Sequence, residues 1–595
     1  MKNYNLAILL KEQFAKYAQK SMLKIYRQKK WVEHTGKQCL ETIEKIAASL
    51  LNEGLKKGDT VGIFSQNMPE WTLADIAALN IGCPTIPIYA TNAADQVKYI
   101  LKDAETSVVF VGEQEQYDEL LLALENQELS LKKIIVFDEN VSLKNDISVY
   151  FKDYVAQGNP KQFKTELAER FNEIDSDDTA TLIYTSGTTG KPKGVILTHT
   201  NFLAAIENHK ERYDLTDKDV SMAFLPLSHI FERAWSFLAL SVGMTNIYNR
   251  DPRGIADMLL IAKPTAMCSV PRLYEKVYQM AINTMSKSKA PVKKLFFWAL
   301  EVGKKREEYV RNGKNLPFGL KIKDQIAETL VYKKFREKLG GNLSFIPCGG
   351  AYVGDEVVEF FRAMRLPLIV GYGLSETTAT VSSCQINDYE LGTVGKPINN
   401  VDVKIGENNE ILVKGRTVMK GYYNRPEENE KAFTKDGWFK TGDAGRFDEK
   451  GNLVITDRIK ELIKTAGGKY IAPQMVENVL TKDLEIAQAV VYGERKPYAV
   501  ALITPNFDWL KNWAKEQNIN FQNMVELIKN KKVVKYFEQK VHDLQSELAR
   551  YEQVKKIYLL SQELSMENGE ITPTFKPIRK AIFAKYQNEL EGLYH

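Results

Sequence analysis

Short apolar runs alternate with longer segments of helical spacing in the first third of the chain. Residues 42–55 place apolar side chains every three or four positions and end near a glycine, so they predict a helix. Residues 60–67 follow as an apolar run that predicts a strand. The alternation then predicts a second helix and three more strands, at 71–82, 85–90, 108–112 and 133–137. This order is typical of a parallel sheet covered by helices.

The pattern changes between residues 281 and 340. This segment is rich in lysine and carries a run of large apolar side chains from Leu295 to Trp298. A basic amphipathic helix of this kind can lie on an anionic membrane surface. A helical insertion whose apolar face packs on the protein body explains the same residues, and the sequence leaves both interpretations open.

A second change near residue 457 predicts a domain boundary. After it, residues 486–505 predict a hairpin around Gly493, and residues 507–550 predict charged amphipathic helices. The chain is therefore expected to form a larger and a smaller domain, at 1–457 (with a helical insertion at about 281–340) and at 458–595.

Composition narrows the class of protein. The 595 residues are 44% hydrophobic and 26% charged, as in ordinary globular proteins, and the length requires at least two domains. The net charge of +5 is too diffuse to indicate nucleic-acid binding. Five dispersed cysteines without a C-x-x-C pair fit a reducing cytoplasm and indicate neither a disulfide framework nor a zinc site. No uncharged run reaches the roughly 18 residues of a spanning helix, so we expect a cytoplasmic protein, at most peripheral on the inner face of the membrane.

The most specific motif is YTSGTTGKPKG at residues 184–194. It lies between two apolar stretches, 179–183 and 195–199, and so predicts a strand–loop–strand turn. Its glycines allow backbone N–H groups to surround a phosphate, while its hydroxyls and lysines add donors and positive charge. It is not a Walker P-loop, because Lys191 is followed by Pro192 and no helical pattern comes next. A linker rich in serine, threonine and glycine is the alternative that composition allows.

This motif resembles the phosphate loop of the acyl-adenylate-forming (AMP-binding) superfamily, and further stretches resemble the other superfamily motifs in the same order. They are PCGGA, GYGLSETTA, GWFKTGDAGRFD, DRIKELIKTAGGKYIAP and GEITPTFKPIRK, at 347–351, 371–379, 437–448, 457–473 and 569–580. The resemblance covers nearly the whole chain and implies an α/β fold. That fold has a large N-terminal domain, with mainly parallel sheets covered by helices plus a distorted β-barrel, and a small mobile α+β C-terminal domain.

The resemblance implies roles for the matching residues. Tyr372 is expected to stack on adenine, Asp443 to accept hydrogen bonds from the ribose hydroxyls, and Arg458 to contact ribose or phosphate. Glu376 and Thr185 are the expected ligands of Mg²⁺, although in isolation Glu376 would read as an ordinary carboxylate at a helix start. The other expected ATP- or AMP-binding residues are Ser186, Gly187, Thr188, Thr189, Gly190, Lys191, Gly349, Gly350, Ala351, Gly371, Gly373, Ser375 and Thr377.

The C-terminal motifs imply a domain movement. Lys576 is expected to reach into the site during adenylation, and Lys460 to be the hinge between the two domains. The pair Gly467 and Gly468 is expected to face the site when coenzyme A reacts. Rotation of a small domain about few residues is a known way of switching between two steps.

The segment FLPLSHIFERAW at 224–235 concerns the acyl substrate. His229 and Trp235 border the acyl pocket that the resemblance implies. Each has a plain alternative, since His229 can be a core histidine and Trp235 a buried aromatic residue instead of a gate.

The HIFER string, the TPTFK string and the insertion resemble long-chain fatty acyl-CoA synthetases. The resemblance implies ATP-dependent activation of a long-chain fatty acid through an acyl-AMP intermediate, with Mg²⁺ as cofactor and coenzyme A as acceptor. A fatty acyl-AMP ligase and a medium-chain or aryl acid–CoA ligase would share the nucleotide motifs. A catalytically silent scaffold would be expected to lose Glu376, Asp443 or Lys576, and all three are present.

Overall fold

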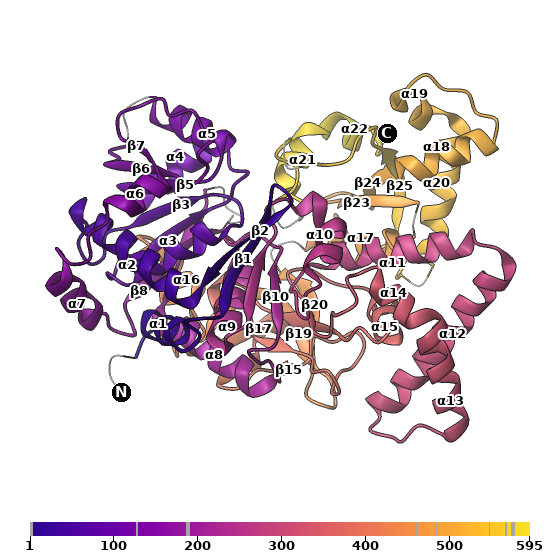
Figure 1. The fold of residues 1–595 in the computed structure, drawn as a ribbon. Helices are drawn as coiled ribbons and strands as arrows, with labels where there is room; N and C mark the ends of the chain where they lie inside the picture. Colours follow the sequence, from indigo (N-terminus) through magenta and orange to yellow (C-terminus); the bar gives the residue numbers. More distant parts are fainter. Residues whose placement is uncertain are drawn as a thin grey trace.

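The computed structural model describes residues 4–125, 129–185, 191–459, 462–467, 469–483, 485–546, 548–565, 568–572 and 577–595. The chain is an α/β protein in which a large N-terminal region holds several sheets and a smaller C-terminal region holds its own (Figure 1). The expected fold class is confirmed.

An eight-stranded sheet, in the order β18-β9-β8-β4-β3-β5-β6-β7, dominates the first part of the chain. It contains the four strands predicted there, as parallel neighbours: β3 (Val61–Phe64), β4 (Thr85–Ile88), β5 (Val108–Val111) and β6 (Lys133–Val136). A further strand that the sequence analysis did not predict, β7 (Ser148–Tyr150), pairs with β6 at the edge. The helices of this part are α2 (Gly36–Asn52), α3 (Pro69–Leu79), α4 (Ala94–Asp103), α5 (Gln114–Leu124), α6 (Phe151–Gln157) and α7 (Lys164–Glu173). The strands β3, β4 and β5 are buried throughout, which is why they read as continuous apolar runs without alternation.

The predicted strand–loop–strand turn is confirmed at the other side of this sheet. Strands β8 (Thr179–Thr185) and β9 (Lys193–Thr198) pair antiparallel on either side of the glycine-rich loop, whose residues 186–190 lie outside the described part. The short β18 (Gly421–Tyr422) pairs with β9, so a much later segment is brought beside the loop.

A second sheet has the order β10-β11-β1-β2 and lies beside two helices, α8 and α9, that line the candidate site. Its strands are β1 (Ser21–Arg27), β2 (Lys30–Thr35), β10 (Val220–Ala223) and β11 (Thr245–Tyr248), and helices α1 (Leu6–Lys16), α8 (His199–Arg212) and α9 (Ile230–Val242) pack against one another beside it. Helix α9 starts at His229, whose side chain accepts a hydrogen bond from the backbone N–H of Phe231. It ends at Gly243, where φ is +85° and a Cβ would lie 2.2 Å from the Tyr17 ring.

Two further four-stranded sheets follow along the chain. They are β12 (Ile346–Cys348), β13 (Leu368–Tyr372), β14 (Ser382–Ser383) and β15 (Lys396–Pro397), then β16 (Val401–Ile405), β17 (Glu410–Gly415), β19 (Phe439–Phe447) and β20 (Leu453–Arg458). Backbone hydrogen bonds from Val394 to Leu453 and from Leu453 to Gly395 join them. Val381, Ile398, Val413 and Leu453 form a common core between them.

The lysine-rich segment is helical. It begins in the last turns of α11 (Pro271–Ser286) and continues through α12 (Ala290–Arg311), α13 (Phe318–Ala327), the π-helical turn η2 (Glu328–Tyr332) and α14 (Lys333–Glu337). The aromatic run of α12 does not face solvent as a membrane surface would require: Phe296 is buried, and Leu295, Phe297 and Trp298 pack half-buried against the main core. The packing alternative therefore holds for these four residues.

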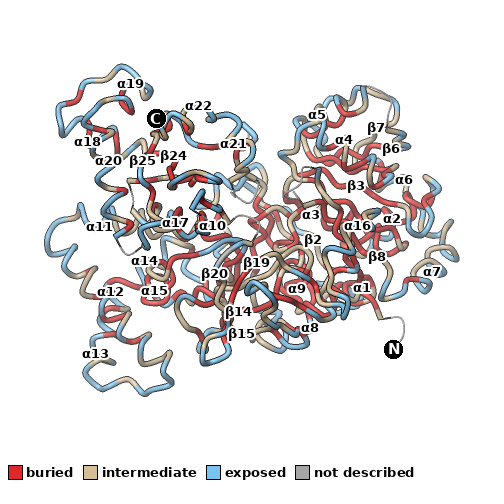
Figure 2. Tube along the Cα trace, turned by 180° about the vertical axis from the view of Figure 1, so that it is seen from behind, coloured by how far each residue is buried: buried red, intermediate tan, exposed pale blue. Residues whose placement is uncertain are grey.

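The C-terminal region has separate cores, visible as buried segments in Figure 2. Its strands are β21 (Ile463–Lys464), β22 (Tyr470–Ile471), β23 (Ile486–Tyr492), β24 (Ala499–Pro505) and β25 (Val554–Leu559). Its helices are α17 (Pro473–Leu480), α18 (Phe507–Glu516), α19 (Met524–Lys529), α20 (Lys531–Leu544), α21 (Arg579–Lys585) and α22 (Gln587–Gly592). The predicted hairpin is the antiparallel pair β23–β24. The two hydrophobic clusters of this region contain only residues from Ile463 onwards.

Candidate active site

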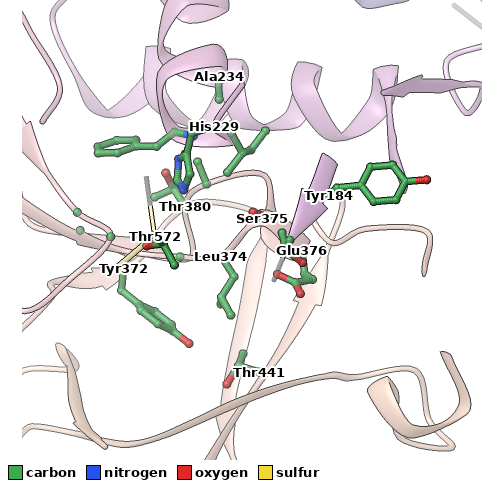
Figure 3. A pocket seen from close by; sticks show the side chains of 18 of the residues that line it. Tyr184, His229, Ala234, Tyr372, Leu374, Ser375, Glu376, Thr380, Thr441 and Thr572 are labelled. Carbon is green, nitrogen blue, oxygen red and sulfur yellow. The ribbon is translucent and has the colours of Figure 1, made fainter. Parts of the chain in front are cut away.

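A cavity of about 800 Å³ lies between the N-terminal sheets, helices α8 and α9, and the C-terminal region. Its lining joins glycine-rich loops and carboxylates at one part to apolar helix side chains at another (Figure 3). The sequence-predicted residues that line it are Thr185, His229, Trp235, Gly349, Gly350, Gly371, Tyr372, Gly373, Ser375, Glu376 and Arg458.

The loops after β12 and β13 form the glycine-lined wall. The two strands are parallel neighbours, so their carboxyl ends open at the same edge of the sheet. Gly350 has φ +86°, and a Cβ on Gly349 would lie 3.3 Å from the carbonyl oxygen of Gly371. A flat group can therefore approach the backbone closely here, as an adenine would need to.

Tyr372, Asp443 and Arg458 form one hydrogen-bonded group. The Tyr372 hydroxyl donates to one carboxylate oxygen of Asp443 at 2.7 Å, and Nε of Arg458 donates to the other at 3.0 Å. Burial, and then the charge of Asp443, raise the pKa of Tyr372 well above its usual value. Asp443 is only 5% exposed and does not itself line the cavity, although its two partners do.

Glu376 lies on the 3₁₀ turn η3 (Ser375–Thr377) and points into the cavity (Figure 3). Its Oε1 accepts a hydrogen bond of 2.8 Å from the hydroxyl of Tyr422, which β18 brings from a distant part of the chain. Burial and the neighbouring carboxylate raise the pKa of Tyr422. Beside it, Lys193 forms an ion pair with Glu428 and lies 5.1 Å from the centre of the Tyr422 ring. Sequence reasoning missed Tyr422 and Glu428, because no local pattern links them to Glu376.

Helices α8 and α9 supply the apolar part of the lining. The residues are Ala205, Ile206 and His209 on α8, Tyr213 directly after it, and Ile230, Phe231, Ala234, Trp235 and Leu238 on α9. Trp235 is held in place, since its Nε1 donates to Ser221 Oγ at 2.9 Å and its ring stacks on Phe345 at 5.8 Å. His229 projects from the start of α9 into the cavity (Figure 3).

The charged residues of the HIFER string anchor α9 instead of lining the cavity. Glu232 is fully buried, accepts hydrogen bonds from the backbone N–H groups of Phe224 and Leu225, and has its pKa raised to about 8 by burial. Arg233 is also buried and pairs with Asp75 at 2.6 Å. Two adjacent charges in an otherwise apolar helix were the available signal for such an anchor.

Among the described residues from Ile463 onwards, Gly569, Ile571, Thr572 and Ile578 belong to the lining. Thr572 points into the cavity among residues of the N-terminal region (Figure 3). The cavity is therefore shared by the two regions.

The remaining predicted residues fall into two groups. Five are described but do not line the cavity: Lys191, Ala351, Thr377, Asp443 and Gly467. Of these, Thr377 is fully buried, and its hydroxyl bonds the backbone of Leu374, so its contacts are structural. Eight others lie outside the described residues: Ser186, Gly187, Thr188, Thr189, Gly190, Lys460, Gly468 and Lys576.

Comparison with known families gives two matches. Residues 10–423 match the AMP-binding enzyme family, and residues 460–595 match the AMP-binding enzyme C-terminal domain.

Curated relatives match over most of their length. The "Long-chain-fatty-acid–CoA ligase FadD15" of Mycobacterium bovis is 35% identical, over 95% of this chain and 93% of that protein. The "Fatty acyl-CoA synthetase A" of Dictyostelium discoideum is 30% identical, over 95% and 86%.

Solved structures share the fold at lower identity. The A-PCP didomain of a carboxylic acid reductase from Segniliparus rugosus, in complex with AMP, superposes with a TM-score of 0.77 at 20% identity, over 100% of this chain and 82% of that one. A fatty acyl-CoA synthetase from Mycobacterium tuberculosis gives 0.64 at 20% identity, over 98% and 99%.

Proposed function

Because this chain belongs to the AMP-binding enzyme family, we propose that it is an acid–thiol ligase that converts long-chain fatty acids to acyl-CoA. The fatty carboxylate attacks the α-phosphorus of ATP, which forms acyl-AMP and releases pyrophosphate. The coenzyme A thiolate then attacks the acyl carbon and expels AMP. The observation that carries the proposal is that a glycine-lined part and an apolar part adjoin within one cavity.

The glycine-lined part fits the nucleotide. The Tyr372 ring lines the cavity together with Gly349 and Gly350, and its hydroxyl donates a hydrogen bond to the carboxylate of Asp443. A carboxylate can accept hydrogen bonds from two ribose hydroxyls at once. We assign Asp443 and Arg458 to the ribose. When the nucleotide binds, a ribose hydroxyl would replace the Tyr372 hydroxyl as donor to Asp443 or would share the carboxylate with it.

The residues present fit Mg²⁺ carried in with ATP. The Glu376 carboxylate and the Thr185 hydroxyl line the same cavity, and Mg²⁺ usually takes one or two carboxylates together with phosphate oxygens. Among the described residues no cluster of three His, Cys, Asp or Glu side chains could hold a metal ion. When bound, the ion would neutralise phosphate charge. In this assignment Tyr422 holds Glu376 in its orientation.

The apolar part fits the acyl chain. Ala234, Trp235 and Leu238 on α9 and Ala205 and Ile206 on the neighbouring α8 all line the cavity. Each buried CH₂ group contributes about 0.8 kcal/mol, so such a wall favours long acids strongly over acetate. We assign His229 to the junction of the two parts, where the carboxylate would react.

The second step is assigned to a rotation of the C-terminal region at Lys460. Lys576 would neutralise charge during adenylation, and the Gly467–Gly468 turn would replace it when coenzyme A enters. Lys460, Gly468 and Lys576 lie outside the described residues, but Thr572 and Ile578, on either side of Lys576, both line the cavity. We place the domain boundary at 457/458, at the end of β20, because one hydrophobic core reaches Ile455 and the next begins at Ile463.

We further propose that the protein works in the cytoplasm and at the inner face of the membrane. Within the described part of the chain, no helix is both long and apolar enough to cross a bilayer. Contact with a membrane, where long-chain acids partition, would then have to be peripheral.

Product analysis tests the function. The purified chain is incubated with MgATP and either palmitate or acetate, with and without coenzyme A, and pyrophosphate and thioester are measured. We expect palmitoyl-CoA and far less acetyl-CoA. Stable acyl-AMP without thioester would indicate a fatty acyl-AMP ligase, and equal efficiency for the two acids would refute the assigned acyl pocket.

A further inference from the structure

Helix α13 and the π-helical turn after it carry an exposed apolar stripe. Phe318 is 80% exposed, Ile322 48%, Ile326 45% and Leu330 42%. The four residues are spaced four apart, so they share one helix face. A contiguous set of large exposed apolar side chains marks an interaction surface in a folded protein.

The opposite face of this helix is firmly packed. Asp324 is buried between Arg306, at 3.1 Å, and Arg365, at 2.5 Å. Tyr332 is fully buried, and its hydroxyl donates to the carbonyl oxygen of Ala299 at 2.7 Å. The stripe is therefore the outward face of a helix that already has its core contacts.

The surroundings of the stripe are positively charged. Five exposed lysines lie between residues 312 and 334: Lys314, Lys321, Lys323, Lys333 and Lys334. The same interval contains only two acidic residues, and both are compensated: Asp324 by Arg306 and Arg365, and Glu328 by Arg336. None of the five lysines forms an ion pair with a described carboxylate. Apolar side chains are thus combined with an excess of cationic ones.

The helix also stands at an end of the molecule. Figure 1 shows α13 projecting beyond α12, away from α21 and α22, and Figure 2 shows the same projection from behind. A flat surface can therefore reach it without meeting the C-terminal region.

We propose that the α13 stripe (Phe318, Ile322, Ile326 and Leu330) and its five lysines form a docking face for an anionic lipid bilayer. The apolar residues enter the boundary between headgroups and acyl chains, and the lysines contact anionic headgroups. A second copy of the chain is a poorer occupant, because a two-fold interface would bring two lysine-rich faces together. The biological role of this docking face rests on the proposed function, because long-chain fatty acids partition into bilayers.

Vesicle co-sedimentation tests the docking face. Phosphatidylcholine vesicles with and without phosphatidylglycerol are mixed with wild-type protein and with the variant Phe318→Ser/Ile322→Ser/Ile326→Ser. The control variant Leu122→Ser/Val525→Ser removes two apolar residues from other surfaces, and their exposures of 51% and 49% are close to those of Ile322 and Ile326. We expect the stripe variant to lose at least about tenfold in binding to anionic vesicles, and the control to bind like wild type.

Three results would overturn the docking face: equal binding of the stripe variant, equal binding to neutral vesicles, or binding that high salt does not weaken. A fourth overturning result would come from sedimentation velocity without lipid, if the wild type were a dimer and the stripe variant a monomer. Thioester formation from detergent-solubilised palmitate separates the two proposals. It should be unchanged in the stripe variant, whereas its absence from wild type would contradict the proposed function and leave the vesicle result standing.

Discussion

The buried ion pair that anchors α9 gives a prediction whose size can be worked from its contacts. Arg233 donates four hydrogen bonds: two to Asp75, at 2.6 and 3.0 Å, and one each to Thr85 and Thr181, at 2.7 and 2.6 Å. The side chains of Arg233 and Asp75 are 1% and 0% exposed. Arg233→Met removes the cation and keeps most of the apolar stem.

The expected loss is about 3–5 kcal/mol in the stability of the N-terminal region, because the carboxylate of Asp75 is left buried without its partner. Only the 2.7 Å hydrogen bond from Thr85 would remain to it. Burial already raises the pKa of Asp75, so the variant should recover part of its stability at low pH, where that carboxyl is neutral. In Asp75→Asn/Arg233→Met no charge is buried, and at least half of the loss should return.

Urea denaturation followed by tryptophan fluorescence measures this effect near the pair. The Trp71 ring centre lies 5.5 Å from the Arg233 guanidinium, and Trp235 is on the same helix. Amide hydrogen exchange of α9 separates local loosening from unfolding elsewhere. A loss below about 1 kcal/mol for the single variant, or equal losses for single and double variants, would refute the reasoning.

Three further outcomes are expected. Burial raises the pKa of Glu232 from 4.5 to about 8, so the stability of the wild type should fall as pH rises between these values. In Glu232→Gln, melting temperatures recorded across this range should fall less with pH, and an unchanged slope would contradict the prediction. Tyr422→Phe removes the hydroxyl that orients Glu376 and should slow pyrophosphate release about tenfold, with conversion of synthetic acyl-AMP to acyl-CoA unaffected; equal loss in both assays would argue against a positioning role. Lys576→Ala should slow adenylation by about 100-fold or more and keep thioester formation from acyl-AMP. Lys460→Pro should keep adenylation and lose thioester formation, and equal losses in both assays for both variants would contradict domain rotation.

The fold could be predicted where local pattern decides it. The short strands of the main sheet are apolar throughout because both faces are buried, and the turn between β8 and β9 carries its own glycine signature. The aromatic run of α12 was ambiguous for a physical reason: helical periodicity marks an apolar face but cannot say whether protein or lipid covers it. The exposed stripe of α13 became visible only when burial was known.

The candidate site divides in the same way. The motifs identified Tyr372 and Glu376, because each lies within a short run of characteristic residues. They did not identify the hydrogen-bond contacts that hold these side chains in place. Tyr422 reaches Glu376 through the pairing of β18 with β9, and Arg233 reaches Asp75 across 158 residues. Such contacts depend on tertiary arrangement, which a single sequence does not record.

The pairing of β19 with β20 connects nucleotide binding to the proposed rotation. Asp443 and Arg458 are opposite each other in this pair, and β20 ends at Arg458. The proposed hinge, Lys460, comes two residues later in the chain. Everything assigned to the nucleotide therefore precedes the hinge, except the segment around Lys576 that is proposed to act in only one step. A rotation at this point can exchange that segment for the Gly467 turn without moving the residues that hold the adenylate, so the intermediate need not be released between the two reactions.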